Sequence, residues 1–150
     1  MLVGLKLLHV VFAIVAVGFN LTYGILLARA GREPEHLGHV LRTVKFLDDR
    51  FANPAYGLLL LTGIGMTFAP NGPPITTFWI MAALVLFALL VFMGVFLYAP
   101  TLRRQIAALE ADGMNSPEYQ RLARRSAIVG GSFSVPLLLV LYLMVFKPVL

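Results

Sequence analysis

The sequence predicts an all-α protein: a transmembrane up-down four-helix bundle, N-out and C-out, with cytoplasmic amphipathic helical extensions. Its residues are 59% hydrophobic and its mean hydropathy is +0.86, well beyond the composition of a soluble globular domain. Long apolar runs alternate with short polar segments, and the positive charge is concentrated in two of those segments. The 150 residues suit a single transmembrane domain. We expect its spans at about 2–28, 52–69, 75–99 and 127–147.

The first half of the chain predicts two spans joined by a charged helix. In the first span Lys6 is the only charged residue, and the run is long enough to cross ~30 Å of hydrocarbon. A cleaved signal peptide is the alternative, but the run exceeds the usual apolar core of about 7–15 residues. The segment 29–50 carries nine of the nineteen charged residues and has apolar residues at helical spacing, which predicts an amphipathic cytoplasmic helix. Asn53-Pro54 then predicts a break or kink before the second span.

The second half predicts a hairpin and two further spans. The uncharged, turn-rich segment 70–74 predicts a tight connection to the third span. A short amphipathic continuation follows Pro100. Ser116 as N-cap and Pro117 at the first helical position predict that the last helix begins before the membrane. Pro136 interrupts that helix.

The distribution of basic residues predicts the orientation. Ten of the twelve Lys and Arg residues lie in the two segments that follow the first and third spans. The positive-inside rule places these segments in the cytoplasm, and therefore places both termini on the periplasmic or extracellular side. Because this placement explains the net charge of +5, we expect membrane lipids and no nucleic acid as partners.

One face of the first span is polar. Residues at steps of three and four share a helix face, and here they are Lys6, His9, Ala13, Ala16, Asn20 and Tyr23. Lipid would penalise this face, so we expect it to point into the bundle, where the small residues admit a close neighbour.

His9 is the candidate ligand of a cofactor. It should lie about two turns below the outer surface, and the predicted topology brings Met66, Met81 and Met144 to a comparable depth. An imidazole with a thioether or another second ligand could hold a b-type haem. The alternative is a histidine hydrogen-bonded to a backbone carbonyl or to a neighbouring Asn or Tyr, with methionines that only pack.

One chain provides too few histidines to supply both ligands of a haem iron. Because His9 is the only membrane-embedded histidine, the site would use His plus Met, His plus another ligand, an open position, or a homodimer with two copies of His9. Lys6 could reach the outer headgroups or a haem propionate.

Other chemistry finds less support in the sequence. The absence of cysteine excludes disulfides, thiolate metal sites and cysteine-ligated iron–sulfur clusters. His36 and His39 are three apart on the cytoplasmic helix, and solvated side chains are the preferred interpretation. Asp48-Asp49-Arg50 precedes the expected kink and could pair with Arg103 or Arg104, or face water.

Four short motifs are spread over nearly the whole chain: Leu5-Lys6-Leu7-Leu8-His9-Val10, Leu61-Thr62-Gly63, Ala99-Pro100-Thr101-Leu102-Arg103 and Met144-Val145-Phe146-Lys147-Pro148. Together they resemble an uncharacterised bacterial family of small four-helix integral membrane proteins, a domain of unknown function. This resemblance implies the bacterial inner membrane.

The opening Lys6-Leu7-Leu8-His9 also resembles the first helix of membrane protoporphyrinogen oxidase, which binds b-type haem, and of copper-resistance membrane proteins. In those groups a Trp-containing stretch follows the histidine, where this chain has Val15-Ala16-Val17-Gly18. The oxidases also carry a lysine after a later Trp, whereas Trp79 precedes Ile80-Met81-Ala82. The resemblance therefore implies a haem pocket around His9 and puts the oxidase activity itself in question.

Three functions are consistent with these residues. The first is a haem-binding or redox-associated membrane protein with His9 as ligand. The second is a non-enzymatic accessory or assembly subunit of a larger membrane complex. The third, a copper-handling permease, ranks last because the methionines form no recognisable ladder. A homodimer or larger assembly fits a bundle this thin, and the sequence leaves open whether the protein is an enzyme.

Overall fold

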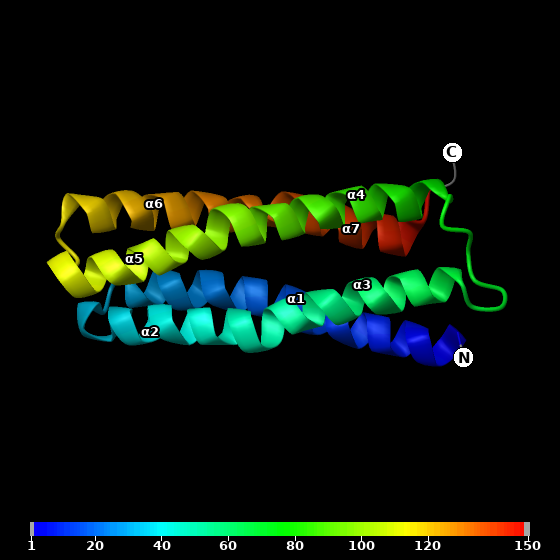
Figure 1. The fold of residues 1–150 in the computed structure, drawn as a ribbon, viewed down its shortest axis with the longest axis horizontal. Helices are drawn as coiled ribbons and strands as arrows, with labels where there is room; N and C mark the ends of the chain where they lie inside the picture. The colour runs from blue at the N-terminus through cyan, green and yellow to red at the C-terminus, as the bar shows by residue number, and fades with distance from the viewer. Residues whose placement is uncertain (1, 149–150) are drawn as a thin grey trace.

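A computed structural model describes residues 2–148, and every regular element in that range is helical, which confirms the all-α class. The elements form four helical rods that run along one long axis (Figure 1). The rods are, in chain order, α1 (Leu2–Ala30); α2 (Pro34–Leu47), η1 (Asp48–Ala52) and α3 (Asn53–Thr67); α4 (Phe78–Phe92), η2 (Met93–Tyr98) and α5 (Ala99–Asp112); and α6 (Pro117–Ser132) and α7 (Ser134–Phe146).

Three of the described helices are long and apolar enough to cross a membrane: Leu2–Ala30, Phe78–Asp112 and Pro117–Phe146. The segment predicted as the second span is not among them, because α3 has only 15 residues and charged residues precede it. The third helix begins at Phe78, later than predicted. Thr77 has an extended backbone and ends a turn in which its amide donates to the Pro74 carbonyl.

Two of the prolines are accommodated by π-helical turns. Of the break or kink predicted at Asn53-Pro54, the break is wrong, since the second rod stays helical from α2 through α3, with the irregular turn η1 immediately before Asn53. In the third rod η2 likewise ends just before a proline, Pro100. Proline has no amide hydrogen and its ring crowds the carbonyl one turn earlier, so a wider turn relieves both problems. The fourth rod is interrupted at Phe133, between α6 and α7 and close to Pro136, as predicted.

The rods pack as two pairs that meet near one extremity. α1 contacts α2 and α3, while α4 contacts α7 and α5 contacts α6. The pairs join through α2 and α5, which supply the largest fully buried side chains, Leu41, Val44 and Leu102. We call this extremity, with the turns at 31–33 and 113–116, the basic end. α1 begins and α7 ends at the other extremity, the terminal end, beside the 68–77 connection (Figure 1).

The predicted start of the last helix is confirmed. The Ser116 hydroxyl accepts a hydrogen bond from the Tyr119 amide at 3.2 Å, and Pro117 is the first residue of α6. This cap satisfies one of the amides that a helix leaves unpaired at its start.

Removing the cap should destabilise the protein measurably. Ser116→Ala is expected to lower the free energy of unfolding by about 1 kcal/mol, which corresponds to a Tm lower by roughly 2–4 °C. Thermal unfolding in detergent, followed by far-ultraviolet circular dichroism, measures this. Ser132→Ala is the matched control, because that exposed hydroxyl bonds only to the Val129 carbonyl of its own helix. Equal melting of both variants and wild type would contradict the capping role.

Candidate functional site

An apolar cavity of about 890 Å³ lies between the two helix pairs toward the terminal end. α1 and α3 line one side, and α4 and α7 line the other. Most lining side chains are aliphatic or aromatic. The few polar ones include Lys6, His9, Thr67, Trp79 and Lys147. A large apolar space with few polar groups is the usual form of a small-molecule or cofactor site.

His9 is held at the wall of this cavity by α3. Its Nδ1 lies 3.0 Å from the Leu59 carbonyl oxygen and 3.1 Å from the Thr62 hydroxyl oxygen. A carbonyl oxygen only accepts, so we assign the proton to Nδ1, which leaves the Nε2 lone pair available. Histidines that bind a metal commonly use one nitrogen in this way to fix the orientation of the ring. The carbonyl partner weighed as the alternative role for His9 is thus compatible with a ligand role for Nε2.

Gly63 allows this close approach of α1 and α3. A Cβ placed on Gly63 would lie 3.0 Å from His9 Cε1, closer than side chains normally pack. The imidazole therefore lies directly against the α3 backbone. Gly63 belongs to the Leu61-Thr62-Gly63 motif, and small residues serve this purpose where membrane helices meet.

The structure brings only some of the predicted cofactor ligands together. Met66 of α3 and Met144 of α7 line the cavity with His9. Met81 does not line it, and 48% of its surface is exposed on α4.

The polar stripe of α1 divides between two environments. Lys6, His9 and Ala13 line the cavity. Farther along the helix, the Asn20 amide donates to the Ala16 carbonyl and to the Tyr56 hydroxyl, and Tyr23 is buried in the core near the basic end. Asn20 and Tyr23 therefore pack the bundle away from the cavity.

Trp79 and Lys147 were not predicted as site residues. The Lys147 ammonium lies 5.6 Å from the centre of the Trp79 ring, and both residues line the cavity. A cation over an aromatic face is attracted to it. Their positions at the outer ends of the third and fourth predicted spans are the available signal, but a role at the membrane interface is the ordinary interpretation of each residue alone.

Near the basic end Arg42 of α2 pairs with Glu110 of α5, but the two aspartates before α3 find their partners on their own rod. Asp49 bonds Lys45 on its own rod, and within residues 2–148 no ion pair joins Asp48 or Asp49 to Arg103 or Arg104. His36 and His39 fall in no cluster of three or more metal-liganding side chains in the described chain.

A methyl group on Gly63 should displace the histidine. We expect Gly63→Ala to lower the free energy of unfolding by about 1–3 kcal/mol through overpacking against the ring. Gly57→Ala, on the same helix, is the control. A Cβ at position 57 meets nothing within 4 Å, and alanine has a higher helix propensity than glycine. Thermal unfolding in detergent compares the two. Gly63→Ala melting at or above Gly57→Ala would refute the contact.

No curated protein and no solved structure matches this chain. A family model described as "Predicted integral membrane protein (DUF2269)" matches residues 3–148. This match extends over all four rods and therefore includes the helices that line the apolar cavity, α1, α3, α4 and α7. The chain therefore belongs to the DUF2269 family of predicted integral membrane proteins, whose function is unknown.

Proposed function

We propose that this chain is a four-span protein of the bacterial inner membrane that binds a b-type haem in the apolar cavity, with His9 as a ligand of the iron. The observation that carries the proposal is the position of His9 at the wall of a space of about 890 Å³, with Nδ1 held by the Leu59 carbonyl.

The arrangement of the rods supports four crossings. Three crossings would leave the chain ends on opposite faces of the membrane, whereas α1 begins and α7 ends at the same extremity (Figure 1). The second rod packs beside α1, which is long and apolar enough to cross the membrane. The α3 part of the second rod is therefore the fourth crossing. The ten clustered basic residues gather toward the basic end, which the positive-inside rule assigns to the cytoplasm. Both termini then face the periplasm.

The lining of the cavity suits a porphyrin. Its volume lies within the range of about 300–1,000 Å³ that is usual for ligand sites, and its apolar walls would cover the ring faces. Met66 and Met144 are the thioethers available as a second ligand or as packing against the macrocycle. Lys6 and Lys147 are cations in the same lining that could pair with propionates. A haem bound here would supply one-electron redox chemistry, which the chain's own side chains lack.

Visible spectroscopy tests the haem proposal. Purified protein supplied with haem should give a Soret band that shifts on dithionite reduction. His9→Ala should lose this band, because it removes the imidazole nitrogen that would bind the iron. His39→Ala, which changes an exposed histidine of α2, is the control and should retain it.

A wild-type protein that stays colourless after haem is supplied would overturn the haem site and favour the accessory or assembly role. If His9 is the ligand and a methionine completes the site, Met144→Leu or Met66→Leu should change the reduced spectrum without abolishing the band. The control Met81→Leu should leave the spectrum unchanged, since Met81 does not line the cavity.

Single cysteines test the orientation, because the native chain has none. Thr76 lies in the 68–77 connection and Asn115 in the turn at the basic end, and both residues are exposed, so we choose Thr76→Cys and Asn115→Cys. A membrane-impermeant maleimide should label Thr76→Cys in intact spheroplasts and should label Asn115→Cys only after permeabilisation. The opposite labelling pattern would reverse the orientation. Labelling of both cysteines before permeabilisation would exclude the four-crossing arrangement, which places them on opposite sides of the membrane.

A further inference from the structure

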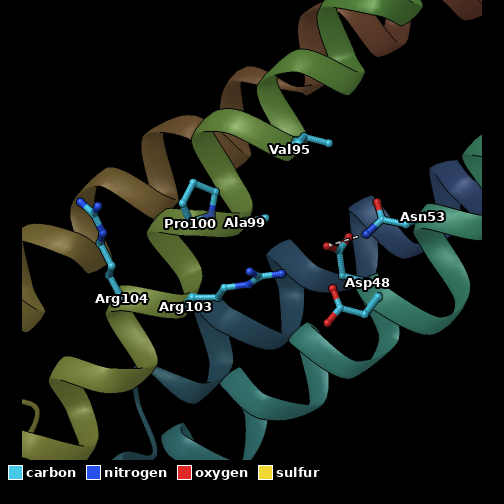
Figure 2. Close-up of a pocket in the computed structure, with 9 residues that line it drawn as sticks. Asp48, Asn53, Val95, Ala99, Pro100, Arg103 and Arg104 are labelled. Atoms are coloured by element: carbon cyan, nitrogen blue, oxygen red, sulfur yellow. Dashed lines mark hydrogen bonds between the residues drawn. The ribbon is translucent and has the colours of Figure 1, made fainter.

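A second pocket, of about 430 Å³, lies between the second and third rods where their π-helical turns occur (Figure 2). η1 and the start of α3 form one wall, and η2 and the start of α5 form the other. The lining residues are Asp48, Asp49, Asn53, Gly94, Val95, Ala99, Pro100, Arg103 and Arg104.

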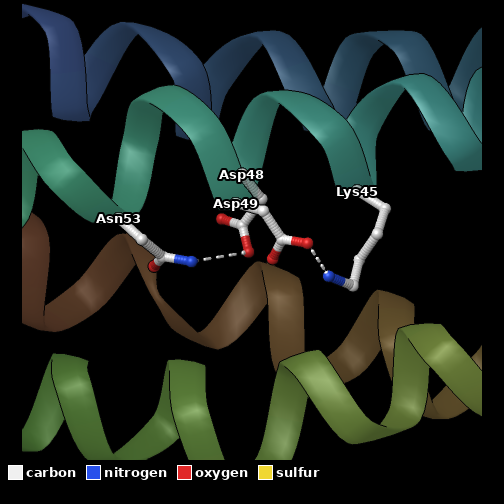
Figure 3. Close-up of polar contacts among 4 residues, drawn as sticks. All are labelled: Lys45, Asp48, Asp49 and Asn53. Carbon is white, nitrogen blue, oxygen red and sulfur yellow. Dashed lines mark hydrogen bonds and ion pairs between the residues drawn. The ribbon is translucent and has the colours of Figure 1, made fainter.

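The two walls carry opposite charges. Asp49 is already paired with Lys45, whereas Asp48 accepts one hydrogen bond, from the Asn53 amide at 3.4 Å (Figure 3). Arg103 extends from the third rod toward Asp48 and Asn53 (Figure 2). Among the described residues no ion pair within 4.0 Å crosses the pocket. The geometry leaves room between the carboxylate and the guanidinium groups for a molecule that carries both a cation and an anion.

A cationic partner would stabilise the charged form of the Asp48 carboxyl group. Its side chain is half-buried, and burial raises the pKa of its carboxyl group, as does the negative charge of Asp49. The Lys45 ammonium and the Asn53 amide act in the opposite direction on the same pKa. Because the folded-state pKa of Asp48 is raised, the charged form costs stability at neutral pH and the cost disappears as the pH falls.

The pocket stands at the border between charged and apolar surface. Phe51, Val95 and Phe96 come from the same two turns, and each exposes half of its surface or more. In a bilayer such side chains face hydrocarbon, while charged groups at this depth meet phospholipid headgroups. An occupant can therefore place acyl chains on the apolar side chains and a polar head in the pocket.

We propose that this pocket binds the headgroup of an aminophospholipid of the phosphatidylethanolamine class. The phosphate lies at Arg103, which extends toward the opposite wall (Figure 2), and the primary ammonium donates hydrogen bonds to the Asp48 carboxylate and the Asn53 side-chain oxygen. Guanidinium groups suit phosphate, and hydrogen bonds to charged groups are the strong ones. Phosphatidylcholine has no ammonium hydrogen to donate, and phosphatidylglycerol has no cation for Asp48.

Native mass spectrometry of the full chain tests this, with phosphatidylethanolamine, phosphatidylglycerol and phosphatidylcholine of identical acyl chains added to the detergent. Wild type should retain phosphatidylethanolamine about tenfold better than either competitor, the discrimination expected from a charge-assisted hydrogen bond. Asp48→Asn should lose that preference. Arg103→Gln should weaken phosphatidylethanolamine and phosphatidylglycerol alike. Asp112→Asn and Arg125→Gln make the same charge changes at exposed positions outside the pocket and should behave as wild type.

A stability measurement separates loss of binding from loss of folding. In lipid-free detergent at neutral pH, Asp48→Asn should melt at a higher temperature than wild type, because it removes a carboxylate whose charged form is disfavoured. That gain should shrink as the pH is lowered and Asp48 becomes protonated. A variant that is more stable and yet has lost the lipid preference supports a binding role for Asp48.

Three results would overturn the proposal. Wild type could retain phosphatidylglycerol or phosphatidylcholine as well as phosphatidylethanolamine, or Asp48→Asn could keep the preference. Displacement of the lipid by soluble phosphoethanolamine at equal concentration would assign the pocket to a free aminophosphate instead. The outcome is independent of the haem proposal, since His9→Ala leaves this pocket intact and should bind lipid as wild type does.

Discussion

The packing of α2 against α5 is the contact on which the rest of the arrangement depends. Leu41, Val44 and Leu102 are fully buried there and form the main contact between the two helix pairs, which α1 and α6 also join. Close packing near the basic end lets the pairs leave a large space between them at the terminal end. The position of the apolar cavity thus follows from hydrophobic burial at the far extremity, since core packing resists deformation and fixes the relative placement of the rods.

The prolines shape the space between the rods without breaking them. In hydrocarbon every backbone polar group needs a partner inside the protein, so an open break would be costly. The π-helical turns η1 and η2 keep the second and third rods helical up to Pro54 and Pro100. The same two turns present Asp48, Asp49 and Val95 to the smaller pocket. Local relief of proline crowding therefore creates the wall of the proposed lipid site.

Much of the helical pattern could be predicted from the sequence. The rotation of each helix about its own axis, which decides the side chains that face the cavity, could not. Apolar runs and the Ser116 cap predicted the elements because they depend on local chemistry. α4, in contrast, is apolar all round, so nothing in its sequence indicated that Met81 would point away from the cavity. The periodic stripe on α1 predicted one polar face, and packing decided that His9 lines the cavity while Asn20 bonds Tyr56. The π-helical turns escaped prediction because proline signals a defect without specifying how the backbone absorbs it.

The approach of His9 to Gly63 has an evolutionary consequence. Because a methyl group at position 63 would lie 3.0 Å from the ring, the imidazole disfavours any residue larger than glycine at that position. A lineage that lost the histidine would release the glycine from selection, and larger residues would accumulate there by drift. The residue at position 63 in each member of the family would then record whether that lineage still maintains the imidazole.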